Sequence, residues 1–171
     1  MEANPYRPQL IAVDANVLFD LADDREDVLD AVSVIRGRWP DVRFLMPPTV
    51  QQELMNWALR RNTEQSQSAR KAIQFSRTWR ITPASLIAVS HGIAERIALR
   101  VRERGLLPEE EINDSLILVE SSLLGCSMLL TSDAHLRGVD FERLTLELQA
   151  FDVAAPVIAT PREIVRKFFQ H

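Results

Sequence analysis

The chain has 171 residues, of which 46% are hydrophobic and 26% are charged, an ordinary balance for one globular domain with its own core. Its formal net charge of -4 excludes an overall positive field that would draw the whole molecule to nucleic acid, but it leaves room for a local basic patch. The single cysteine excludes an internal disulfide, and the lack of a long apolar stretch or a signal-peptide pattern predicts a cytoplasmic protein with no membrane span.

The chain opens with an apolar run over residues 9–14 that predicts a buried strand ending in an acid, Asp14. Asn16 follows and is most simply the cap of a short helix. A second helix is predicted over residues 27–39, because apolar residues recur there at helical spacing before Pro40 stops the pattern.

A second strand is predicted over residues 42–46, and two prolines end it. Thr49 with Gln52 resembles a capping box that opens the next helix. Glu53 therefore falls within about one turn of the start of that helix.

The next segment, residues 60–80, is rich in Arg, Gln and Ser and poor in aliphatic residues, and it contains one acid, Glu64. This composition predicts an exposed helix or a helical hairpin. A longer helix is expected over residues 86–104, with an arginine row at i, i+4 and i+8 on one face and Gly105 as its C-terminal cap.

The stretch from residue 109 to residue 136 predicts the centre of the domain. It begins with acids and continues as a nearly uncharged helix that has Asp114 near its start. Gly125 predicts a tight turn, residues 126–130 predict a buried strand, and Asp133 lies just past that strand's end.

The chain ends with an amphipathic segment at 141–151, a short strand at 156–159 and a last helix. Thr160 and Glu163 are spaced as the capping box of that helix. Strands alternating with helices predict an α/β domain in which helices flank a mainly parallel sheet on both faces.

Four acids gather in this scheme: each lies where a strand ends or a helix begins, and in a parallel α/β sheet those ends share one edge. The acids are Asp14, Glu53, Asp114 and Asp133. Ionised carboxylates in one pocket repel one another, and a divalent cation relieves that repulsion. Ligands that are all oxygen favour Mg²⁺ or Mn²⁺, and such sites suit metal-assisted hydrolysis of phosphodiesters.

The motifs of this site are Asp14-Ala15-Asn16, Glu53, Asn113-Asp114 and Thr131-Ser132-Asp133. In this order and context they resemble the PIN-domain ribonucleases, many of which are toxins of VapC-type toxin–antitoxin pairs. The resemblance covers nearly the whole chain. It implies a PIN-like (Rossmann-like) three-layer sandwich and a metal-dependent endoribonuclease that hydrolyses RNA by in-line attack of water.

The resemblance also implies roles for individual residues. The acidic set would be catalytic and would bind Mg²⁺ or Mn²⁺, with Asp14, Asp114 and Asp133 as the main ligands and Glu53 completing the site. Four polar neighbours would orient ligands or substrate, although caps and turns explain them most simply; these are Asn16, Asn113, Thr131 and Ser132.

The chain is longer than the compact toxins of this family, and we expect one domain over residues 1–171 with an Arg-rich helical insertion at about 60–104. Basic side chains of this segment are candidates for the RNA backbone: Arg60, Arg61, Arg70, Lys71, Arg77, Arg96, Arg100 and Arg104. Expected partners are an RNA substrate, a cognate antitoxin and a second copy of the chain.

Four other functions stay open from the sequence. A haloacid dehalogenase-type phosphatase would need a second Asp where Asn16 stands, and a nucleotide-binding module would need a Gly-rich loop that this chain lacks. A non-cleaving PIN-like module that binds RNA or protein, and a nuclease acting on DNA, both fit the same acids. Metal-dependent cleavage assays on RNA and DNA separate these last two from a ribonuclease.

Overall fold

In the computed structural model, which describes residues 8–61 and 63–169, five strands form one sheet. They are β1 (Leu10–Val13), β2 (Arg43–Met46), β3 (Ile81–Pro83), β4 (Met128–Leu130) and β5 (Val157–Ala159). Every pair is parallel, and the strand order is β3-β2-β1-β4-β5. The chain therefore leaves β1 toward one edge of the sheet and later returns to β1's other side. This makes the β1–β4 junction the topological switch point.

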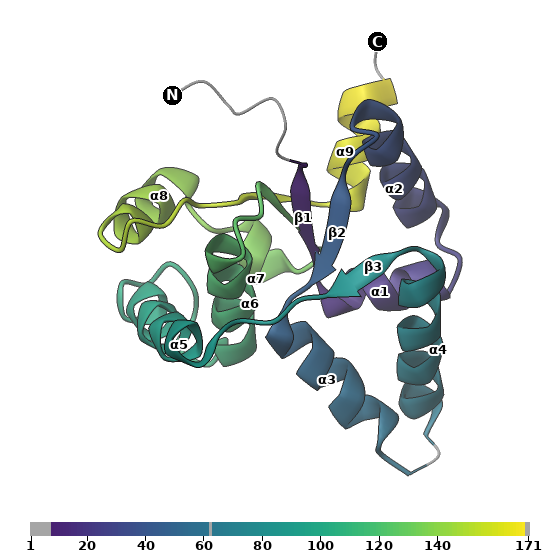
Figure 1. The fold of residues 1–171 in the computed structure, drawn as a ribbon, viewed down its shortest axis with the longest axis horizontal. Helices are drawn as coiled ribbons and strands as arrows, with labels where there is room; N and C mark the ends of the chain where they lie inside the picture. The colour runs from purple at the N-terminus through teal and green to yellow at the C-terminus, as the bar shows by residue number, and fades with distance from the viewer. Residues whose placement is uncertain (1–7, 62, 170–171) are drawn as a thin grey trace.

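Helices cover both faces of this sheet, as Figure 1 shows: α5, α6 and α8 lie on one side, and α2 and α9 lie on the other. The helices are α1 (Ala15–Ala22), α2 (Glu26–Arg38), α3 (Pro48–Ala58), α4 (Glu64–Thr78), α5 (Ala88–Glu103), α6 (Ile112–Leu123), α7 (Ala134–Arg137), α8 (Phe141–Gln149) and α9 (Pro161–Phe169). The expected three-layer α/β sandwich with a parallel sheet is confirmed.

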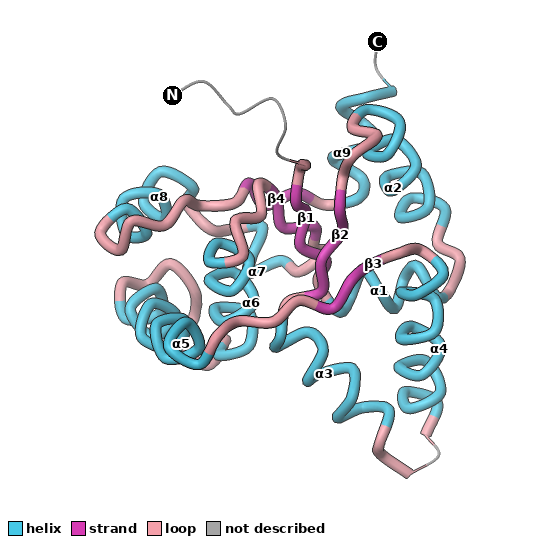
Figure 2. Tube along the Cα trace, in the orientation of Figure 1, coloured by secondary structure: helices cyan, strands magenta, loops and turns pink. Residues whose placement is uncertain are grey.

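The strands lie at the centre of the molecule, surrounded by helices (Figure 2). Ile11, Ala12 and Val13 of β1 are at most 1% exposed, and β4 contributes the buried Leu129 and Leu130. Side chains on both faces of β1 are thus covered, which explains why the run reads as continuously apolar rather than alternating. Among residues 8–61 and 63–169, no helix has the length and apolar character needed to cross a bilayer.

The Arg-rich segment at residues 60–80 forms one helix, α4, so the helix and not the hairpin is the alternative that holds. The helix is not fully exposed, because it buries Ala69 and Ala72 and packs against α1 and α3. The strand β3 follows it, inside the stretch 60–104 that we expected to be helical, and we did not predict it. Two of β3's three residues are exposed, so the strand carries no apolar pattern that the sequence could show.

Helix starts account for most other differences. Asp14 caps α1, so the prediction that Asn16 is the cap is wrong, and Glu111 rather than Asn113 precedes α6. Thr49 does not form a capping box, because it is itself a buried residue of α3. The predicted capping box of α9 is confirmed: Thr160 Oγ1 accepts from the Glu163 amide at 3.1 Å, and Glu163 Oε2 accepts from the Thr160 amide at 2.9 Å.

The turn before β4 follows the sequence closely. Gly125 has a φ of +74°, a left-handed conformation that glycine adopts without strain. Cys126 is buried, as expected for a small apolar side chain, but β4 begins two residues later, at Met128. After this turn, β4 pairs with β1 in the register Leu130 to Val13, which places the residues that follow Leu130 beside Asp14.

Candidate active site

The candidate site lies at the carboxyl ends of β1 and β4, which flank the switch point of the sheet. Asp14 follows β1 directly, and its amide donates to the Leu130 carbonyl at 3.0 Å. Thr131 and Asp133 follow β4. The two strands thus deliver their polar residues to the same edge of the sheet, as the alternation of strands and helices predicted.

Asp14 is the most buried acid of the site, with 4% of its surface exposed. Its Oδ1 accepts from the Ala15 amide at 2.6 Å, which caps α1. Its Oδ2 accepts from Thr131 Oγ1 at 2.7 Å and from Asn16 Nδ2 at 2.9 Å. Burial raises the pKa of Asp14, these hydrogen bonds oppose the rise, and the nearby Asp133 adds to it.

Asn16, Thr131 and Ser132 join the two strand ends around Asp14. Asn16 Oδ1 accepts from the Ser132 amide at 3.0 Å, and Asn16 Nδ2 also donates to Thr131 Oγ1 at 3.3 Å. Thr131 Oγ1 in turn accepts from the Asp133 amide at 3.0 Å. Asn16 and Thr131 therefore orient the acids directly, whereas Ser132 takes part through its backbone.

Asp133 caps the short helix α7, because its Oδ1 accepts from the amides of His135 at 2.8 Å and Leu136 at 2.9 Å. Asp114, from the first turn of α6, lies within hydrogen-bonding reach of the Asp133 carboxyl. Burial and the charges of Asp133, Asp14 and Glu111 together raise the pKa of Asp114 to about 8. The folded protein therefore disfavours the charged form of this carboxyl.

Glu53 comes from α3 and faces the start of α6. Its Oε1 accepts from Asn113 Nδ2 at 2.6 Å. Burial raises the pKa of Glu53, the Asn113 bond lowers it, and the charges of Asp14 and Glu120 raise it further. Asn113 therefore positions Glu53 and is not a helix cap.

The four expected acids are thus electrostatic neighbours, although they come from four different elements of the chain. Their oxygens are ligands that a hard cation such as Mg²⁺ or Mn²⁺ prefers, and burial together with the neighbouring acids raises the pKa values of Asp14, Glu53 and Asp114. Within the described residues, no three His, Cys, Asp or Glu side chains are arranged to hold one ion between them. The donor chemistry fits a divalent ion, and the close carboxylate pair is Asp114 with Asp133.

Sequence reasoning missed Glu120, a buried acid on α6 that is 3% exposed. It accepts from the Thr49 amide at 2.9 Å and from Thr49 Oγ1 at 2.7 Å. Burial raises its pKa, and the two bonds from Thr49 oppose that rise. The signal was present in the sequence, because Glu120 is the one charged residue of α6 after Asp114.

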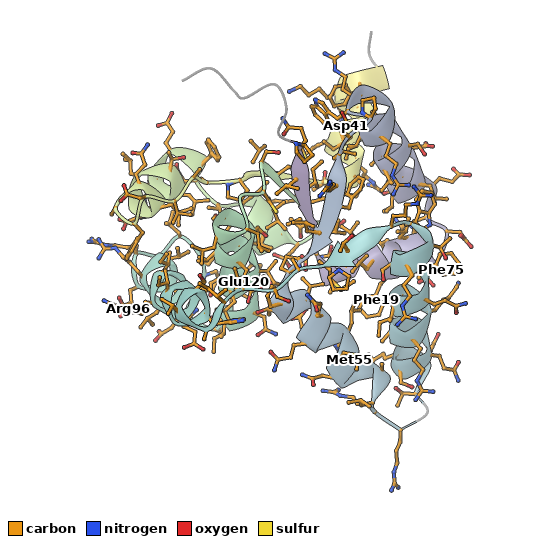
Figure 3. The ribbon with its side chains drawn as sticks, in the orientation of Figure 1. Phe19, Asp41, Met55, Phe75, Arg96 and Glu120 are labelled. Carbon is orange, nitrogen blue, oxygen red and sulfur yellow. The ribbon has the colours of Figure 1, made fainter. Side chains whose placement is uncertain are left out.

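Several of the expected RNA-backbone residues are engaged within the protein. Arg100 and Arg104 share Glu147 at 2.8 and 3.5 Å, and the Lys71 ammonium lies 3.9 Å from Asp23. Further contacts join the Arg60 guanidinium to the ring of Trp57 and Arg70 Nε to the Ala58 carbonyl. Arg61, Arg77 and Arg96 are exposed, and Figure 3 places Arg96 on the outer side of α5.

A cleft of about 370 Å³ adjoins the acids at Ser132 and is lined by residues of both charges. Its arginines are Arg25, Arg137, Arg162 and Arg166, and its acids are Asp20, Asp27 and Glu163. Asp27 pairs with Arg25 and Arg162, and Glu163 pairs with Arg137. The sequence did not single out this cleft, because its residues come from α1, α2, α7, α9 and the loops beside them, which are far apart in the chain.

The molecule is an α/β protein that gathers carboxylates at the switch point of a parallel sheet, the edge at which such folds place their sites. The sequence matches the PIN domain family over residues 11–142, so this chain belongs to the PIN family, whose members are in general nucleases. No curated protein sequence matches it significantly.

Among solved structures, the chain is similar to one in the crystal structure of VapBC2 from Rickettsia felis bound to a DNA fragment from their promoter. The two chains are 11% identical, with a TM-score of 0.60, and the match covers 89% of this chain and 98% of the other. At that identity the likeness concerns the fold. It agrees with the resemblance that the sequence motifs had suggested.

Proposed function

We propose that this protein is an endoribonuclease that hydrolyses RNA phosphodiester bonds with Mg²⁺ or Mn²⁺ at the four acids. The observation that carries the proposal is the crowding of Asp114. Its pKa of about 8 arises because burial and neighbouring acids disfavour its charge, and a divalent cation is the simplest partner that would favour it.

In this proposal Asp114 and Asp133 hold the ion together with Asp14, and Glu53 completes the site. Such an ion polarises the scissile phosphate and lowers the pKa of the attacking water. The protein's own groups keep the acids oriented: Thr131 and Asn16 fix Asp14, and Asn113 fixes Glu53. The acids are thus held in position in advance of substrate binding.

We propose that the RNA strand reaches the acids through the cleft beside Ser132. Four arginines and three acids line this cleft, so positive charge is in excess by one. Arg25 and Arg162 share one acid, Asp27, and Arg166 lines the cleft beside Arg162. The exposed Arg61, Arg77 and Arg96 remain candidates for further phosphate contacts. Phosphate contacts of this kind give affinity without sequence preference.

The similarity to a VapBC2 complex supports a further part of the proposal, that this chain is the toxin of a type II toxin–antitoxin pair. An antitoxin would then cover the acids and suppress cleavage. Exposed apolar side chains are available for protein partners, including a second copy of the chain. Met55 on α3 and Leu59 just after it are 50% and 76% exposed.

The test is cleavage of a labelled single-stranded RNA pool by the purified wild type and by Asp114→Asn, in EDTA, Mg²⁺ and Mn²⁺. We expect cutting that needs the ion and is lost in the variant. A parallel single-stranded DNA pool separates a ribonuclease from a DNA nuclease. If the wild type binds Mn²⁺ by calorimetry but cuts neither pool, a non-cleaving binding module replaces the nuclease. Absence of both cutting and ion binding would refute the role of the four acids.

A further inference from the structure

The N-terminus of α3 is held by a side chain from another helix. Its N-cap, Pro47, offers no side-chain acceptor. Glu120 of α6 takes that place, with Oε2 accepting from the Thr49 amide at 2.9 Å and Oε1 accepting from Thr49 Oγ1 at 2.7 Å. Figure 3 shows Glu120 within the group of helices, between α6 and the start of α3.

This contact is one of two between the same pair of helices. Thr49 and Glu53 are one turn apart on one face of α3, and Asn113 and Glu120 are two turns apart on one face of α6. The second contact is the bond from Asn113 to Glu53. The two contacts, three hydrogen bonds in all, therefore tie α3 to α6 at two points that are one helical turn apart on α3.

Packing is incomplete on one side of this junction. A cavity of about 130 Å³ lies beside the first contact, lined by Pro48, Thr49, His91 and Glu120 among others. On that side the two hydrogen bonds to Glu120, rather than packed side chains, hold the first turn of α3. Sequence-distant acids of the site, Glu53 and Asp114, are carried by these same two helices.

We propose that Glu120 is a positioning residue of the candidate active site: by holding Thr49, it sets the place of Glu53 relative to Asn113 and Asp114. The proposal rests on the proposed nuclease function for its kinetic consequences only. Its structural content is that loss of the Thr49–Glu120 contact changes the Glu53–Asn113 contact one helical turn away.

Thr49→Val is the main test, because it removes the hydroxyl with little change of shape and keeps the amide bond. Misplaced or loosened orienting groups typically cost about ten- to a hundredfold in activity or metal affinity. We expect kcat and Mn²⁺ affinity to fall by at least about tenfold, with a change of KM of less than about twofold. Thr49→Ser should restore both values, and Glu120→Gln should reproduce the loss.

Ser121→Ala is the matched control. It also removes a buried hydroxyl from α6, one that donates to the Ile117 carbonyl and has no bond to α3. It should lower the melting temperature and leave kcat and Mn²⁺ affinity unchanged. If Thr49→Val also lowers only the melting temperature, Glu120 is a structural residue and the proposal is overturned.

A measurement that needs neither cleavage nor metal separates this proposal from the proposed function. The side-chain amide signals of Asn113 in a nitrogen–proton correlation spectrum report its bond to Glu53. They should shift in Thr49→Val, return in Thr49→Ser and stay fixed in Ser121→Ala. Unchanged Asn113 signals in Thr49→Val refute the positioning role even if the protein is a nuclease. Shifted signals support it even if the protein does not cleave RNA.

Discussion

Replacing Asp114 with Asn should stabilise the protein in the absence of divalent ions while it removes ion-dependent cleavage. In the folded state the pKa of Asp114 is raised to about 8 by burial and by nearby acids, against an ordinary value of 3.8. Between these two values the unfolded chain gives up the proton and the folded chain keeps it. Stability therefore falls as the pH rises through this window, and the Asn variant escapes that loss.

The size of the effect follows from the change in pKa. At about 1.4 kcal/mol per pKa unit, the full rise would correspond to about 6 kcal/mol. The Asp114 side chain is only partly buried, and solvent screening reduces that figure, so we expect about 2 kcal/mol at pH above about 8 and almost none below pH about 4. For a chain of this length, about 2 kcal/mol raises the melting temperature by about 4–8 °C.

The assay is urea unfolding of the wild type and Asp114→Asn in EDTA at several pH values across this window. Only the difference between the two proteins is interpreted, because Asp14, Glu53 and Glu120 titrate in both. Adding Mn²⁺ should then stabilise the wild type more than the variant, since the ion replaces the proton on the crowded acids. A difference that does not grow with pH would refute the crowding of Asp114, and with it the electrostatic argument for a cation.

Two further variants test the surroundings of the acids. Thr131→Val removes a hydroxyl that donates to Asp14 and accepts from the Asp133 amide, so it should lower the free energy of unfolding in urea by about 1–3 kcal/mol and lower cleavage. Thr131→Ser should keep the stability and the cleavage of the wild type. Equal stability of the two variants would contradict the hydrogen-bond network. Arg166→Ala should weaken RNA binding at low salt and reduce the slope of log Kd against log salt by about one, as measured by fluorescence anisotropy. Replacing Arg38, which is exposed outside the cleft, with Ala should change neither the affinity nor the slope. An unchanged slope for Arg166→Ala would place the RNA elsewhere.

The fold and the position of the acids could be predicted because both follow from local patterns. Short apolar runs ending in Asp14 and before Asp133 mark strands, and parallel strands bring their ends to one edge. Glu53 and Asp114 follow from helix starts, which meet the same edge. Chain order alone, combined with this rule, therefore predicted which acids would be neighbours.

The contacts among those acids could not be predicted in the same way. Asn16 and Asn113 both occupy plausible cap positions, but the tertiary structure shows that acids cap or precede the two helices. The side chain of Asn16 instead bonds Thr131 and Ser132, and that of Asn113 bonds Glu53. Local capping rules ignore acceptors from distant segments. The same limit explains Thr49, whose acceptor, Glu120, lies 71 residues away.

Substitutions of the four acids differ in whether a loss of cleavage can be attributed to lost chemistry or to a disturbed fold. Asp14 accepts three hydrogen bonds and caps α1, so replacing it disturbs the start of a helix and the junction of β1 with β4 as well as any ligand. Asp133 likewise caps α7. The pKa of Asp114 is instead raised by burial and by like charges, so replacing it with a neutral side chain relieves both costs within the fold. A loss of cleavage in a more stable Asp114→Asn protein therefore reports on chemistry, whereas the same loss in an Asp14 variant would have two explanations.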